Sequence, residues 1–143
     1  MFTPRWFPPN QLPRYPHLSV DDSMIIDTFL ISPPINLSQI CYDVPIGEGR
    51  PSLESMPENL VSNWKYLTSL KIDAIFDFLT YYIVVEIKPE LDLKTIGQVL
   101  TYEFLLRKSN FLNKPFSMGW IGYEGHPDII TFARSKSIIL YFI

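Results

Sequence analysis

The sequence predicts an α/β fold with a central mixed sheet flanked by helices. Hydrophobic residues make up 47% of the 143 residues and charged residues 19%, a composition typical of a chain that buries a core. The hydrophobic pattern alternates along the chain between the period of a helix and that of a strand. From about residue 52 onwards the expected order is helix, two strands, helix, strand, helix, strand, which indicates an α/β domain.

The first segment, residues 1–20, is rich in proline and aromatic residues. Five prolines fall within the first sixteen residues, interleaved with Trp6, Phe7 and Tyr15. Because proline fixes φ and lacks an amide proton, we expect an extended arm here rather than a helix. The arm has three alternative roles: it covers its own domain (residues 21–143), contacts a second copy of the chain, or binds a foreign partner.

Two extended runs are expected between the arm and the core. An isoleucine-rich run at 24–32 is closed by Pro33 and Pro34, and a second run at 40–46 ends before Gly47. Such runs bounded by proline and glycine are typical of strands. We therefore expect a short β region in front of a core that spans about 52–143.

The core elements follow from hydrophobic spacing and from capping residues. Apolar residues at intervals of three and four predict the first helix, which Pro57 delays or kinks. Asp92 is a suitable N-cap for the second helix, and Pro127 lies near the first turn of the third. The predicted helices cover 53–67, 93–108 and 127–134, and the predicted strands cover 71–79, 81–88, 116–123 and 137–143.

Composition excludes several classes of function. Cys41 is the single thiol and the two histidines, His17 and His126, are far apart, so neither an internal disulfide nor a structural zinc site is expected. No apolar run reaches the roughly 18 residues that a membrane span needs. The opening lacks the order of a signal peptide, and we expect an intracellular protein of cytoplasm or nucleoid, with a viral origin also open.

Three charged residues interrupt otherwise apolar strands. Asp73 lies in the first predicted core strand, and Glu86 and Lys88 lie two residues apart in the next, on one face. Pairing of the two strands can place Asp73 beside them. Two carboxylates suit Mg²⁺, and a neighbouring ammonium can hold a phosphate or assist proton removal from water.

These residues, followed by Gln98 and Tyr102 on the next helix, resemble the PD-(D/E)xK nuclease superfamily, in particular the branch with a Gln-x-x-x-Tyr motif. The resemblance covers about residues 52–143 and implies a restriction-endonuclease-like core. The position before Asp73 is Ile72, where the family name has proline.

The resemblance also implies the roles of these residues. Asp73, Glu86 and the backbone carbonyl of Ile87 would ligate Mg²⁺, or Mn²⁺ as a substitute, and Lys88 would position or activate the attacking water. Gln98 and Tyr102 would face the same site and contact the nucleic-acid backbone, with Gln98 taking part in catalysis. Three further acids stay open: Asp77 as a rival of Asp73, and Glu54 or Glu58 as an additional ligand from the first helix.

The function expected from this resemblance is metal-dependent hydrolysis of phosphodiester bonds in nucleic acid, with double-stranded DNA favoured. Cleavage of both strands by a chain with one site would require a homodimer or a higher oligomer. Two alternatives remain: a noncatalytic structural or assembly component, for instance viral, that keeps the fold, and a DNA-binding module without cleavage. The net charge of −3 decides between none of these.

Overall fold

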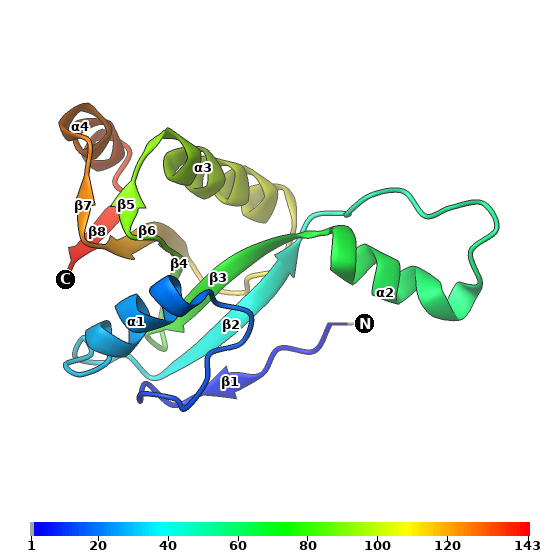
Figure 1. Cartoon of the computed structure of the whole chain (residues 1–143), viewed down its shortest axis with the longest axis horizontal. Helices are drawn as coiled ribbons and strands as arrows, with labels where there is room; N and C mark the ends of the chain where they lie inside the picture. Colours follow the sequence, from blue (N-terminus) through cyan, green and yellow to red (C-terminus); the bar gives the residue numbers. More distant parts are fainter. Residues whose placement is uncertain (1) are drawn as a thin grey trace.

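A computed structural model describes residues 2–143, and over this range the chain is an α/β protein with a six-stranded mixed sheet and four helices (Figure 1). The sheet order is β1-β2-β3-β4-β6-β8, in which β1 to β4 pair antiparallel and β4, β6 and β8 pair parallel. These strands are β1 (Trp6–Phe7), β2 (Gln39–Ile46), β3 (Leu70–Asp77), β4 (Tyr82–Ile87), β6 (Phe116–Gly122) and β8 (Ile139–Phe142). A separate parallel pair joins β5 (Glu90–Leu91) and β7 (Glu124–Gly125).

Helices cover both faces of the sheet. The four helices are α1 (Val20–Phe29), α2 (Glu58–Thr68), α3 (Leu93–Lys108) and α4 (Pro127–Ser135). Buried residues of α1 pack with one face of β3 and β4, whereas buried residues of α3 and α4 pack on the opposite face. Within residues 2–143 no helix is both long enough and apolar enough to cross a bilayer.

The predicted strand at 24–32 is wrong, because this segment belongs to helix α1. Ser19 caps the helix by accepting a hydrogen bond from the Asp22 amide at 3.1 Å, and Ile25, Ile26 and Phe29 recur at helical spacing on the buried side. The sheet is therefore already covered by a helix that starts at residue 20. The packed core therefore includes α1 and β2, which lie before the boundary expected at about residue 52.

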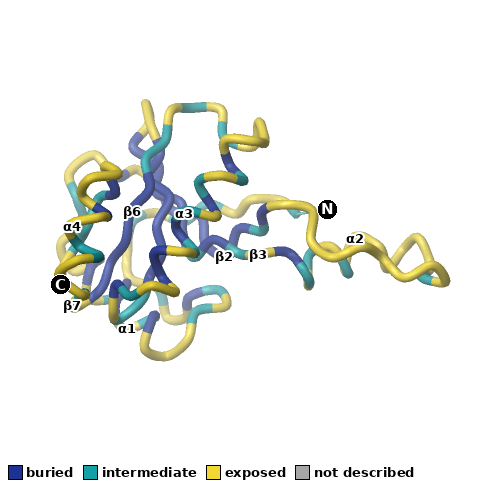
Figure 2. The backbone as a smooth tube through the Cα atoms, turned by 90° about the horizontal axis from the view of Figure 1, so that it is seen from above, coloured by how far each residue is buried: buried dark blue, intermediate teal, exposed yellow. Residues whose placement is uncertain are grey.

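The predicted helix at 53–67 is also corrected, because α2 starts only at Glu58, directly after Pro57. None of the residues of α2 is buried. Together with the loop before it, α2 stands away from the sheet, as the exposed segment in Figure 2 shows. We call residues 47–69 the protrusion; it is inserted between β2 and β3.

The other predicted elements are confirmed to within about two residues. Helix α3 has the predicted bounds, and its N-cap Asp92 accepts a hydrogen bond from the Thr95 amide at 2.8 Å. The strands at 40–46, 71–79, 81–88, 116–123 and 137–143 correspond to β2, β3, β4, β6 and β8, and the helix after Pro127 is α4.

The N-terminal arm covers its own domain, which was one of the three alternatives. Trp6 and Phe7 form the edge strand β1 against Cys41 and Ile40 of β2. The Tyr15 side chain is buried and donates a hydrogen bond to Asp27 of α1 at 2.7 Å. The aromatic residues of the arm are thus part of the packing on the chain's own sheet.

Candidate metal centre

Asp73 and Glu86 lie opposite each other on β3 and β4, since the neighbouring pair Ala74 and Val85 is in register. The Asp73 carboxylate accepts a hydrogen bond from the Ile87 amide at 2.8 Å. Glu86 is only 2% exposed. Two acidic side chains therefore lie opposite each other on neighbouring strands, with Glu86 buried and Asp73 half-buried.

Burial raises the pKa of both carboxyl groups above their ordinary range. The charge of Asp73 raises the pKa of Glu86 further, because two carboxylates at close range repel each other. The two side chains are within hydrogen-bonding reach, which favours a single proton shared between them. Without a cation, the pair holds a proton at neutral pH.

Lys88 and Asp22 form the second part of the centre. The Lys88 ammonium lies 2.9 Å from the Asp22 carboxylate on α1, which is 5% exposed. Burial disfavours the charged lysine, but the hydrogen bond that Lys88 donates to Asp22 and the charges of Asp73 and Glu86 outweigh this and raise the pKa of Lys88. Lys88 is therefore a fixed positive charge.

Asp22 is the site residue that the sequence analysis missed. It could have been found from the Ser-x-x-Asp spacing of Ser19 and Asp22, which is typical of a helix start, had the apolar run after it been interpreted as a helix. Asp22 lies in the first turn of α1, and its carboxylate is paired with Lys88.

Gln98 and Tyr102 approach the pair from α3, one turn apart, as predicted. Tyr102 is 5% exposed, and burial together with the charges of Glu86 and Asp73 raises its pKa. The neighbouring Gln98 side chain opposes this increase in pKa. The structure thus brings together Asp73, Glu86, Lys88, Gln98 and Tyr102, and adds Asp22.

The donor set fits a divalent cation. Oε1 of Gln98 is buried and has no hydrogen-bond partner among the described residues, and Oε2 of Glu86 has none apart from the proton that it can share with Asp73. An unpartnered buried oxygen is costly. Over residues 2–143 no three acidic, histidine or cysteine side chains are grouped closely enough to hold a metal by themselves. Mg²⁺ needs only one or two protein carboxylates and completes its shell with water and substrate oxygens.

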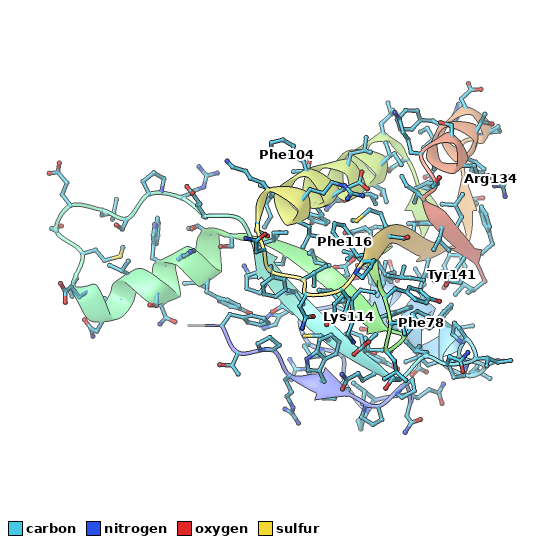
Figure 3. The ribbon with its side chains drawn as sticks, turned by 180° about the vertical axis from the view of Figure 1, so that it is seen from behind. Phe78, Phe104, Lys114, Phe116, Arg134 and Tyr141 are labelled. Atoms are coloured by element: carbon cyan, nitrogen blue, oxygen red, sulfur yellow. The ribbon has the colours of Figure 1, made fainter. Side chains whose placement is uncertain are left out.

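The other predicted acids lie elsewhere. Asp77 forms an ion pair at 2.8 Å with Lys114, and accepts a hydrogen bond from Gln39 at 2.9 Å. Lys114, labelled in Figure 3, belongs to the loop before β6. Although burial opposes its ionisation, these bonds lower the pKa of Asp77. Glu54 and Glu58 are exposed on the protrusion. None of these three belongs to the centre as the structure has it.

A cluster next to the centre anchors the protrusion. Asp43 of β2 lies opposite Asp73 of β3, since the flanking pairs of Tyr42 with Ala74 and of Val44 with Ile72 are in register. The backbone of Asp43 is in the left-handed region, with φ of 54°. Its carboxylate accepts a hydrogen bond from the Tyr66 hydroxyl of α2 and lies 3.5 Å from Nε2 of His17. A buried charged residue with strained backbone requires such partners. The cluster fixes the end of α2 that is nearest the sheet.

No family model, curated protein or solved structure matches this chain.

Proposed function

We propose that this chain is a metal-dependent nuclease of the PD-(D/E)xK type that hydrolyses phosphodiester bonds in nucleic acid, with DNA as the first substrate to test. The observation that carries the proposal is the pair of Asp73 and Glu86, which lie opposite each other on neighbouring strands, with Glu86 buried and the charged Lys88 nearby. Asp77, an acid on the same strand, instead has its own cation and hydrogen-bond donor in Lys114 and Gln39.

Asp73 and Glu86, with the carbonyl of Ile87, are the residues proposed to hold Mg²⁺. The bound ion would neutralise charge on the scissile phosphate and make a bound water a better nucleophile. This role explains why two acids are kept in the interior, where ionisation without a cation is unfavourable.

Lys88 is proposed to hold the attacking water and a phosphate oxygen. Because its pKa is raised and Asp22 fixes its ammonium at 2.9 Å, Lys88 donates hydrogen bonds rather than accepting a proton. Of the two roles expected for this lysine, the geometry therefore supports positioning. Asp22 acts through Lys88 and is a positioning residue.

Gln98 and Tyr102 are proposed to contact the phosphate backbone. The raised pKa keeps the Tyr102 hydroxyl protonated, so that it can donate a hydrogen bond to a phosphate oxygen. The Gln98 side chain has a free amide oxygen that can accept from water in the site.

The test is incubation of the protein with supercoiled plasmid in Mg²⁺, Mn²⁺ or EDTA. Wild type should nick the plasmid with either metal and not in EDTA, and Glu86→Gln and Lys88→Ala should each lose at least about 100-fold in rate. Glu103→Gln, a matched change at a solvent-facing ion pair on α3, should cleave as wild type does.

Each other result rejects the proposal in a defined way. Cleavage by Glu86→Gln at the wild-type rate would show that the site is wrong. Retention of DNA by a wild-type protein that never cleaves it would favour the binding module. Neither binding nor cleavage would favour the assembly component.

A further inference from the structure

A cavity of about 410 Å³ lies at the base of the protrusion, where α2 meets the end of β2 and the loop after α3. Its volume falls in the range of roughly 300–1,000 Å³ that is typical of small-molecule sites. Three aromatic side chains line it: Phe2 of the arm, Tyr66 of α2 and Phe111 of the loop after α3. Aromatic rings from three distant segments thus meet at one hollow.

The side of α2 that faces this cavity is polar and aromatic rather than aliphatic. Four residues at positions i, i+3, i+4 and i+7, which is the spacing of one helix side, line the cavity: Ser62, Lys65, Tyr66 and Ser69. By the same period Leu60 and Leu67 lie on the opposite side of α2, where they are 46% and 71% exposed. A helix that served only to pack would turn its leucines inward. The inner side of α2 therefore suits a ligand with an aromatic ring and polar groups.

The charges at the cavity favour an anionic ligand. Among the described residues that line it, Lys65 is the only charged one. The Lys71 ammonium donates to the carbonyl oxygens of Tyr66 and Ser69, the latter at 3.1 Å, so a second cation lies beside two lining residues. The carboxylate of Asp43 accepts a hydrogen bond from the Tyr66 hydroxyl, which fixes the ring of Tyr66.

Two elements lead from this cavity to the candidate metal centre. Asp73 is four residues beyond Ser69 along β3, which is about 13 Å at 3.3 Å per residue of strand. Ser109, which also lines the cavity, is seven residues beyond Tyr102 of α3, which is about 10 Å at 1.5 Å per residue of helix. This separation corresponds to a few nucleotides at roughly 3.4 Å for each nucleotide of a stacked strand.

We infer that the cavity takes one unpaired base of a nucleic-acid strand whose backbone continues to the metal centre. The base stacks on the rings of Tyr66 and Phe111, and any of the four bases can do so because each has a π face. Lys65 and Lys71 lie beside this base and attract the phosphates of the same strand.

The inference rests on the proposed function for the class of ligand, and it adds that the preferred substrate is single-stranded or frayed. A paired base cannot enter the cavity. A duplex reaches it only when a base is extruded, which costs the pairing and stacking of that base.

Fluorescence anisotropy with a labelled oligo(dT) strand, in EDTA so that the strand stays intact, tests the inference. Wild type should bind this strand at least about fivefold more tightly than the blunt duplex of the same length, and Phe111→Ala should weaken single-strand binding at least about fivefold. The matched control is Phe104→Ala, which removes a ring that is 65% exposed on α3, outside the cavity (Figure 3), and should bind as wild type does.

A photoreactive base locates the contact directly. Oligo(dT) with one 4-thiothymidine should crosslink to the peptides that contain Tyr66 or Phe111, as identified by mass spectrometry. Absence of single-strand binding, equal binding of strand and duplex, wild-type binding by Phe111→Ala, or crosslinks confined to other peptides would each overturn the inference.

The plasmid assay separates this outcome from that of the proposed function. A protein that crosslinks through Tyr66 or Phe111 but never nicks plasmid keeps the base site and loses the nuclease. A protein that nicks plasmid in Mg²⁺ but binds strand and duplex equally keeps the nuclease and loses the base site.

Discussion

Asp73 and Glu86 show how burial can prepare two acids for a cation. Burial raises the pKa of each, and the close approach of the second acid raises that of Glu86 further. In the unfolded chain both ionise near their ordinary values. The folded metal-free protein therefore loses stability as the pH rises above the ordinary carboxyl range, because only the unfolded chain has released its protons.

Mg²⁺ should reverse this loss, because it replaces the shared proton with a stronger positive charge. The rise in melting temperature on adding MgCl₂ in place of EDTA should be several degrees larger at about pH 8 than at about pH 6. Calorimetric melts at the two pH values measure it.

The Glu86→Gln variant is the control for this linkage, since its amide carries no ionisable proton. Its melting temperature should respond little to Mg²⁺ at either pH. An equal response of wild type and Glu86→Gln would disconnect the carboxyl pair from the metal.

At the scale of elements, the site depends on how closely β6 approaches the end of β4. Gly122 of β6 lies against the backbone of Lys88, and a Cβ at Gly122 would overlap the Lys88 carbonyl oxygen and the Trp120 ring. Backbone and a fully buried indole cannot move aside at low cost. Glycine at this position is therefore required by the position of Lys88.

Gly122→Ala should destabilise the fold by about 2–3 kcal/mol and displace Lys88. Gly97→Ala, with open space around the added methyl on α3, should instead stabilise it by about 0.5–1 kcal/mol. Urea denaturation of the two variants decides the comparison. Equal stability of the two alanine variants would contradict the packing described for Gly122.

Helix α3 and the central strands could be predicted from the sequence because their signals are local. Asp92 caps α3, and the apolar runs of β3 and β4 have the composition of strands. Helix α1 could not be recognised in the same way, because an isoleucine-rich run bounded by prolines has the composition of a strand. Its helical state depends on the Ser19 cap and on packing against β3 and β4, and Asp22 was missed with it.

Asp77 shows the limit of strand periodicity for choosing between two acids. The period of two places Asp73 and Asp77 on the same face of β3. Asp77, however, lies at the end of the strand, where it pairs with Lys114 and accepts a hydrogen bond from Gln39. Those partners come from distant parts of the chain. Periodicity alone therefore could not assign the metal ligand.

At the scale of the whole molecule, the arm and the protrusion have opposite roles. The arm adds a strand to the edge of β2 and buries Tyr15, so it stabilises its own domain. The protrusion leaves its apolar side uncovered. Of these two segments, only the arm therefore contributes to the packing of the sheet domain.

Deletion of residues 1–18 should therefore lower the free energy of unfolding by at least about 2 kcal/mol, from the lost burial of Tyr15 and Trp6 alone. The mass in light scattering should fall only by the deleted residues of each subunit. Calorimetry and light scattering on the same sample check both points. A halved mass with an unchanged melting temperature would assign the arm to the contact between subunits.

The central claim, that Asp73 and Glu86 hold a divalent cation, is tested most directly by calorimetric titration with Mn²⁺. Wild type should bind Mn²⁺, and Asp73→Asn and Glu86→Gln should each bind at least about tenfold more weakly, since each loses a charged ligand. Asp77→Asn should keep wild-type affinity, because Asp77 is paired with Lys114 away from the centre. Undiminished binding by Glu86→Gln, or weaker binding by Asp77→Asn than by Asp73→Asn, would contradict the account.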